Sequence, residues 1–257
     1  MAAVSLQVPG TVDDLPPKAG ADDIAGRELI AVVGPPAAGK STVTASVAGT
    51  LGAEVFRLRD FAGRFRRAHP HLDGLFEPVD ALGWFGDPAV EVLLIAAFGR
   101  PAAAETVLLE NFPGSVAQLR FLSELAAERR WILRVVELAA ADAVVAARSD
   151  TRRVCARCEP DPGGQPHRPA RGRPGDPDAC FDCGGDLLRR RCDEPDRFAA
   201  RLHRFRTRRA ELRSTAGAWG VPYVVVDAGD EPAAVVRAFL AACRPISPSP
   251  SFRGASA

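Results

Sequence analysis

The sequence predicts an α/β fold in which a five-stranded parallel sheet is flanked by helices. Short apolar runs of strand length alternate along the chain with longer stretches of helical character. Strands of a parallel sheet are buried on both faces and are therefore continuous in apolar residues. The alternation favours strands that are connected through helices, as in α/β proteins.

Five apolar runs have the length and composition of buried parallel strands. They are Leu29–Val33, Glu54–Leu58, Thr106–Leu109, Trp131–Leu138 and Val221–Val226. Helical patterns fill the gaps, most plainly at Ser115–Arg130 and Asp196–Gly217. In the second of these, Phe198, Leu202 and Phe205 recur at spacings of four and three residues, which places them on one helix face.

The composition limits the class of protein. The chain has 257 residues, of which 47% are hydrophobic and 25% charged, and its formal net charge is +1. These values exclude a disulfide-stapled miniprotein, a disordered acidic chain and a uniformly basic nucleic-acid binder. The sequence has neither an apolar run of bilayer length nor the basic-then-apolar order of a secretory signal. We expect a cytoplasmic monomer without a membrane partner, with flexible tails at 1–27 and 244–257.

A glycine-rich loop follows the first predicted strand. Residues 34–41 read GPPAAGKS and satisfy the pattern GxxxxGK[S/T] of a phosphate-binding loop, or P-loop, between a strand and a helix. Gly34 and Gly39 allow backbone angles that turn amide groups toward phosphate oxygens. Lys40 is expected to reach the β- and γ-phosphates and Ser41 to ligate magnesium. The predicted nucleotide-binding loop comprises Gly34, Pro35, Pro36, Ala37, Ala38, Gly39, Lys40, Ser41 and Thr42.

Positive charge gathers in one part of the chain. Only two residues, Lys18 and Lys40, are lysines, and the remaining basic residues are arginines. Between Arg148 and Arg213 there are 17 arginines and 11 acidic residues, although the whole chain is close to neutral. An anionic ligand is therefore expected to meet this segment.

Four of the six cysteines form two CxxC pairs. Two such pairs supply the four thiolates of a tetrahedral structural zinc site, and in a cytoplasmic chain this spacing favours metal over disulfides. A redox pair, or a zinc ribbon that binds nucleic acid through its arginines, are the alternatives. Cys192 and Cys243 are expected to be buried or half-buried thiols. The predicted zinc ligands are Cys155, Cys158, Cys180 and Cys183.

The 21 residues between Cys158 and Cys180 are rich in proline and glycine, which oppose both helix and central strand. We expect a loop that is held at its two ends. Neither the loop 159–179 nor His167 within it receives a role from the sequence.

Several segments beyond the P-loop resemble the adenylate kinase family of nucleoside monophosphate kinases, whose own loop typically reads GPPGxGK. The stretch VLLENFPGSVAQ at 107–118 is similar to the family's strand and acceptor segment, which usually reads LLDGFPR and ends in Gln four residues further. RSDTRRVC at 148–155 and CFDCGGDLLRRRCDEPDRFAARL at 180–202 are similar to the two ends of its mobile lid. The resemblance covers 28–243. It implies a P-loop NTPase core with an acceptor-binding segment at 55–98 and an inserted zinc lid at 148–192.

The resemblance also implies how ATP would be held. Four arginines match the lid and hinge arginines that close over the migrating phosphoryl group, and Arg189 and Arg191 compete with Arg190 for its place. Glu110 stands where the family usually has an aspartate that orients water on magnesium. The catalytic residues implied are Lys40, Glu110, Arg148, Arg152, Arg190 and Arg201.

The acceptor side departs from the family's pattern. FRLRDFAGRFRR resembles the motif STGDLLR, with Asp60 retained and Arg64 matching only after a shift by one residue. Gln118 stands where the family reads the adenine edge. Gly114 stands in place of the arginine that grips the acceptor's phosphate. The implied acceptor-binding residues are Asp60, Arg64 and Gln118, and the arginines that could replace the missing one are Arg57, Arg59, Arg64 and Arg120.

These features predict a magnesium-dependent kinase that converts ATP and a nucleoside monophosphate, most simply AMP, to two ADP by in-line transfer. Gly114 supports a second hypothesis, a P-loop kinase for a different small acceptor. A third is a non-catalytic nucleotide sensor, or a nucleic-acid-binding module that uses the basic zinc lid. Phe181 is the only aromatic residue of the lid, whereas single-strand binders interleave several. We therefore expect no nucleic-acid partner, and the absence of an NKxD segment argues against a GTP switch.

Overall fold

The structure of the chain is a computed structural model that describes residues 26–99, 104–158 and 169–244. Five parallel strands form one sheet in the order β2-β3-β1-β4-β9. They are β1 (Glu28–Val33), β2 (Ala53–Arg57), β3 (Thr106–Glu110), β4 (Ile132–Ala139) and β9 (Tyr223–Asp227). Each predicted strand is confirmed to within two residues at either end. The predicted P-loop α/β fold is thereby confirmed.

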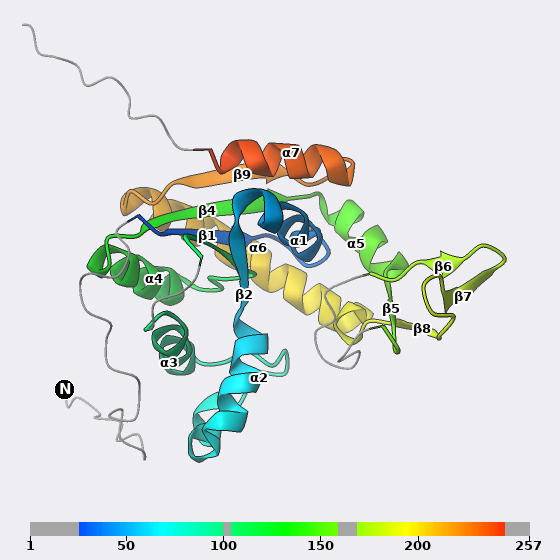
Figure 1. Cartoon of the computed structure of the whole chain (residues 1–257), viewed down its shortest axis with the longest axis horizontal. Helices are drawn as coiled ribbons and strands as arrows, with labels where there is room; N and C mark the ends of the chain where they lie inside the picture. Colours follow the sequence, from blue (N-terminus) through cyan, green and yellow to red (C-terminus); the bar gives the residue numbers. More distant parts are fainter. Residues whose placement is uncertain (1–25, 100–103, 159–168, 245–257) are drawn as a thin grey trace, which may run out of the picture.

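Helices cover both faces of the sheet. Helices α1 and α7 pack on one face, and α3, α4 and the C-terminal part of α6 pack on the other (Figure 1). Their bounds are α1 (Lys40–Leu51), α2 (Leu58–Ala68), α3 (Asp87–Phe98), α4 (Val116–Glu128), α5 (Asp142–Thr151), α6 (Pro195–Ala218) and α7 (Pro232–Ala242), with 3-10 turns η2 (Pro70–Phe76) and η3 (Arg191–Asp193). The helices predicted at 115–130 and 196–217 are confirmed as α4 and α6. Among the described residues, no helix combines the length and apolar character needed to cross a bilayer.

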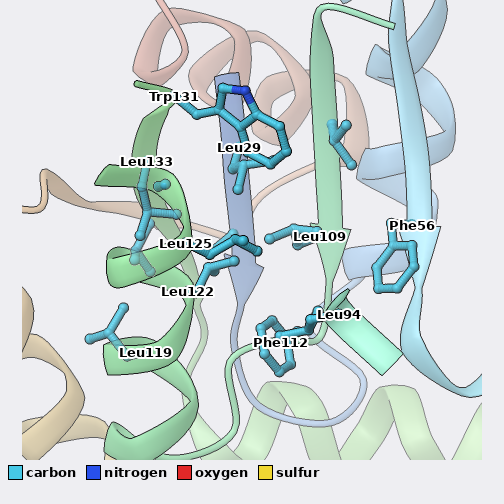
Figure 2. Close-up of a cluster of buried hydrophobic side chains, with 14 of the residues drawn as sticks. Leu29, Phe56, Leu94, Leu109, Phe112, Leu119, Leu122, Leu125, Trp131 and Leu133 are labelled. Atoms are coloured by element: carbon cyan, nitrogen blue, oxygen red, sulfur yellow. The ribbon is translucent and has the colours of Figure 1, made fainter. Parts of the chain in front are cut away.

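The alternation of side chains along β1 divides the core into two clusters. Successive strand residues point to opposite faces, so Leu29 contributes to one cluster and Ile30 to the other. Figure 2 shows the first cluster, in which Leu122 and Leu125 of α4 point toward the strands and Leu119 belongs to the same cluster. The three leucines are spaced three residues apart, which places them along one side of the helix.

Two segments project from the core near the carboxyl ends of the strands. Helix α2 and the turn η2 project on one side, and α5 leads on the other side into four short strands (Figure 1). Of these strands, β5 (Arg153–Cys155) pairs with β8 (Leu187–Arg189), and β6 (Gly172–Arg173) pairs with β7 (Asp176–Cys180), both antiparallel. Residues 148–192 are called the lid from here on.

The loop predicted at 159–179 is wrong in its second half, where β6 and β7 form a hairpin. A two-stranded ribbon consists of edge strands, and edge strands tolerate proline because its missing N–H can face away from the partner. Gly175 has a φ of 84° and allows the tight connection between the strands. Residues 159–168, with His167, lie outside the described residues, as do 1–25 and 245–257 of the two predicted tails.

Gly34, the first residue of the P-loop, approaches the neighbouring strand closely. Its φ is 149°, and a Cβ at this position would lie 2.6 Å from the carbonyl oxygen of Leu138. We expect Gly34→Ala to lower the free energy of unfolding by about 2 kcal/mol or more, because two backbone segments would have to separate. Urea unfolding monitored by circular dichroism measures this change.

Gly49, an exposed glycine within α1, provides the matched control. An added Cβ there meets no described atom within 4 Å. Gly49→Ala is expected to raise the free energy of unfolding by about 0.5–1 kcal/mol, since alanine favours a helix interior. Equal effects of the two substitutions would show that the close approach at Gly34 is not a constraint.

Candidate active site

A cleft opens where β1, β2 and β3 end, the edge at which parallel α/β sheets bind ligands. The P-loop, the start of α2, the end of β3 and the lid all contribute to its walls. Of the residues that the structure describes, eight charged side chains line it, namely Lys40, Arg57, Arg59, Arg152, Arg190 and Arg201 together with Asp60 and Glu110. Six positive charges against two negative ones fit a polyanionic ligand.

The P-loop forms the floor of this cleft. Its lining residues are Pro36, Ala37, Gly39, Lys40, Ser41 and Thr42. Gly39 has a φ of 88° at the N-cap of α1, and Ala37 also adopts a positive φ, of 61°. Of the other predicted loop residues, Gly34 lines an adjoining smaller cavity, Ala38 is buried, and the carbonyl of Pro35 accepts the Ala38 amide at 3.3 Å. The contiguous motif thus stays together at one helix N-terminus, where anions bind.

Lys40 is held back against its own loop. Its Nζ donates to the carbonyl oxygens of Gly34 and Pro35 at 2.8 and 2.7 Å. Burial, followed by the charge of Arg201, lowers the pKa of Lys40 to about 7, and Glu110 opposes this shift. Phosphate oxygens beside the amine would restore its charge.

Glu110 connects the P-loop helix to the neighbouring strand. One carboxylate oxygen accepts the hydroxyl of Ser41, and the other accepts Thr44 Oγ1 at 3.0 Å and Arg57 Nε at 2.9 Å. The register of the sheet explains the last contact, because Arg57 and Glu110 are paired residues at the ends of β2 and β3. The Ser41 hydroxyl and the Glu110 carboxylate lie next to each other and offer oxygen ligands, which magnesium prefers. These two side chains therefore suit a magnesium ion.

The lid brings two arginines to the cleft, Arg152 and Arg190, and α6 adds Arg201. Arg152 is fixed by a bidentate ion pair in which its Nε and Nη2 donate to the two carboxylate oxygens of Asp193 at 2.7 and 2.5 Å. The Asp193 side chain is fully buried. Arg201 donates to the Cys192 carbonyl at 3.4 Å. Burial lowers the pKa of both Arg190 and Arg201 below the usual arginine value.

The neighbours of Arg190 lie elsewhere. Arg189 donates to the Asp193 carbonyl at 3.1 Å and to Asp150 at 2.9 Å, and Arg191 lines an adjoining groove that shares Arg59 and Arg201 with the cleft. The structure therefore separates Arg190 from its two competitors.

Arg148 lies outside the cleft, unlike the other implied lid and hinge arginines. Its guanidinium donates to the carbonyl oxygens of Ala228 and Gly229, at 2.7 and 3.3 Å, in the connection between β9 and α7. The structure thus does not bring Arg148 to Arg152, Arg190 and Arg201.

The implied acceptor residues are not all brought together. Asp60 and Gln118 line the cleft, but the guanidinium of Arg64 lies over the Phe61 ring, 5.9 Å from its centroid and outside the cleft. Gln118 is buried, and both ends of its amide are engaged. Its Oε1 accepts the Gly114 amide at 2.8 Å, and its Nε2 donates to Asp87 at 3.0 Å.

A tryptophan occupies the space over Gly114. A Cβ at residue 114 would lie 2.1 Å from Cζ3 of Trp84, so a side chain at this position would require the Trp84 ring to move. Arg208 donates to the Gly114 carbonyl at 3.0 Å, and the guanidinium of Arg204 lies 4.7 Å from the centroid of the Trp84 ring. Trp84 lines both the main cleft and the smaller adjoining cavity, as do Pro36, Asn111 and Arg201.

The four cysteines of the two CxxC pairs, Cys155, Cys158, Cys180 and Cys183, are placed to hold one metal ion. Their Sγ atoms lie within 4.8 Å of one another, at 3.4 Å for Cys155–Cys183 and 3.9 Å for Cys158–Cys180. A tetrahedral zinc ion with Zn–S bonds of about 2.3 Å separates its sulfurs by about 3.8 Å, which this arrangement matches. The backbone amide of Cys158 donates to Cys155 Sγ and, with the amide of Arg157, lowers the pKa of this thiol to about 7. The other two cysteines are buried, as expected.

Several residues of the cleft were not singled out by the sequence. Asp193, which fixes Arg152, and Trp84, which closes the space over Gly114, are the clearest cases. Trp84 carried a weak signal, as an aromatic residue in the short glycine-flanked segment GWFG. Asp193 carried none, because acidic residues are frequent in the lid segment.

The chain is similar to a curated protein named adenylate kinase from Symbiobacterium thermophilum. The two are 28% identical over 185 residues, which span 71% of this chain and 83% of the relative. No family model matches the chain. The relative confirms the resemblance to adenylate kinases that the sequence shows, and it agrees with the P-loop kinase fold.

We expect the purified protein to contain about one zinc ion per chain, bound by the four cysteines of the two CxxC pairs. Atomic emission spectrometry after exhaustive dialysis measures the metal content. The double variant Cys155→Ser, Cys180→Ser is expected to lose the zinc, because it removes one ligand from each CxxC pair.

The double variant Cys192→Ser, Cys243→Ser is the matched control and is expected to keep the metal, since both thiols lie outside the cluster. Zinc-free wild-type protein, or equal zinc loss from both double variants, would contradict the assignment.

Proposed function

We propose that this protein is a nucleoside monophosphate kinase that transfers the γ-phosphoryl group of ATP to AMP. The observation that carries the proposal is the convergence of Lys40 of the P-loop with Arg152, Arg190 and Arg201 on one cleft. Phosphoryl transfer gathers negative charge on the migrating group, and rigid cations that converge on it stabilise the transition state. The similarity to an adenylate kinase over most of the chain supports the same chemistry.

The donor triphosphate is proposed to lie along the P-loop. Lys40 would exchange its two carbonyl contacts for β- and γ-phosphate oxygens, while Arg152 stays fixed by Asp193. Ser41 and Glu110 would hold magnesium, which neutralises charge on the phosphates when it is bound. Arg57 now donates to Glu110 and keeps this carboxylate at the strand end.

Transfer requires no nucleophile from the protein. An oxygen of the acceptor's phosphate attacks the γ-phosphorus in line, the bond from that phosphorus to the β-phosphate oxygen breaks, and two ADP molecules result from ATP and AMP. The chain contributes positioning and charge. Zinc is proposed to stiffen the lid, whose two small sheets cannot bury a core of their own.

A kinase for a different small acceptor is the second candidate, and the acceptor side of the cleft favours it. The Trp84 ring occupies the space that a side chain at residue 114 would need, and the Gln118 amide is engaged by Gly114 and Asp87 rather than open to a base. The same P-loop and arginines serve the donor in both candidates.

Product analysis tests the proposal. The protein is incubated with ATP, magnesium and one acceptor at a time, namely AMP, GMP, CMP, UMP or a sugar, and nucleotides are separated by chromatography. ADP formation that requires AMP is expected. Turnover with another acceptor would favour the second candidate, and nucleotide binding without any turnover would contradict a kinase.

The lowered pKa of Lys40 predicts that ATP binding takes up a proton. At pH 8 most Lys40 amines of the free protein are neutral, because their pKa is about 7. Phosphates beside the amine favour its charged form, so each magnesium–ATP bound should take up close to one proton at pH 8 and far less at pH 6. Calorimetric titrations in buffers of different ionisation enthalpy measure this number.

Proton uptake at pH 8 that equals the value at pH 6 would contradict the placement of the triphosphate beside Lys40.

The same pKa also affects the stability of the free protein. Through Lys40, the free energy of unfolding is expected to rise with pH between about 7 and 10.5. In that range the unfolded chain binds more protons at this residue than the folded chain.

A further inference from the structure

The acceptor side lacks an arginine at both positions where the resembled pattern places one. Gly114 follows the Phe-Pro dipeptide, and Gly63 stands three residues after Asp60. A kinase acceptor that carries a phosphate still needs a cation near the point of transfer. Four arginines were candidates from the sequence, and the structure places them differently.

Three of these candidates are engaged elsewhere. The guanidinium of Arg64 lies over Phe61, and that of Arg120 lies over Trp219, 5.6 Å from its centroid. Arg57 lines the cleft, but its Nε is bound to Glu110 on the donor side.

Arg59 faces the cleft from the acceptor side. It precedes Asp60 in the first turn of α2 and lines the cleft together with Arg190 and Arg201. Among the described residues, the hydrogen bond of its guanidinium is a long one, of 3.4 Å from Nη2 to the Leu82 carbonyl. An anion with its own hydrogen-bond acceptors can therefore compete for this guanidinium.

The charges around Arg59 also point to an anion. Burial lowers the pKa of Arg59, the nearby Arg190 lowers it further, and Asp80 opposes the shift. Asp80 is itself paired with Arg204, which lies over the ring of Trp84. A phosphate between Arg59 and the arginines of the lid would reduce repulsion across the cleft.

We propose that Arg59 binds the phosphate of the acceptor, in place of a side chain at residue 114, with Trp84 as the wall behind that phosphate. This inference rests on the proposed function and names the acceptor class as a phosphate-bearing small molecule. Arg59 and Asp60 are neighbours at the start of α2, and both line the cleft together with Trp84.

Steady-state kinetics with AMP tests the role of Arg59. Arg59→Gln is expected to raise the KM for AMP by about 10- to 100-fold, the loss of one charge-assisted contact to phosphate, and to change the KM for ATP by less than twofold. Arg66→Gln is the matched control on the same helix, since its partner is the exposed Asp73, and it should change neither constant. An unchanged KM for AMP in Arg59→Gln, or the same increase in Arg64→Gln, would overturn the proposal.

A binding readout separates this inference from the proposed function. Protein loaded with a non-hydrolysable ATP analogue is titrated with AMP, CMP, GMP and UMP, and tryptophan fluorescence is recorded. A monophosphate at Arg59 should change the emission of Trp84, and the change should disappear in both Trp84→Phe and Arg59→Gln. Arg59-dependent binding without phosphoryl transfer would support the inference while refuting the proposed function. If none of the four monophosphates binds in a way that depends on Arg59, the inference is overturned.

Discussion

Crowding of positive charge at one end of the sheet is the constraint on which the rest of the structure depends. Lys40 and the arginines at 59, 152, 190 and 201 line one cleft, and burial lowers the pKa of four of these five groups. Like charges brought close together in a half-buried site repel by several kcal/mol in total. A fold keeps such an arrangement when an anion binds there, and buried Asp193 holds one member of the set in place.

The cleft has two halves of different construction. On the proposed donor side, the P-loop, Ser41 and Glu110 form one connected hydrogen-bond network at the start of α1. On the proposed acceptor side, Trp84 lies directly on Gly114, and Gln118 is turned inward to the Gly114 amide and Asp87. The residues of the first half therefore match the resembled pattern more fully than those of the second half.

The sequence predicted those features that are encoded locally. Each strand was predicted because burial on both faces requires a continuous apolar run, and the P-loop because its residues are contiguous. The zinc ligands followed from the spacing within each CxxC pair. Contacts between distant residues could not be predicted, because pairing of Arg152 with Asp193, or of Trp84 with Gly114, depends on how the fold brings separate segments together. The β6–β7 hairpin was missed because the rule against proline applies to central strands and not to edges.

If the clustered cations bind the phosphates of a nucleotide, ATP should stabilise the folded chain through those phosphates. Anything that binds only the folded chain raises its unfolding free energy, by about 2.7 kcal/mol at one hundred times the dissociation constant. Urea unfolding is therefore measured in the presence of ATP and, separately, of adenosine, which carries the same base and sugar without phosphates. We expect ATP to raise the unfolding free energy and adenosine to leave it unchanged. Equal stabilisation by both compounds, or by neither, would show that the cations do not form a phosphate site.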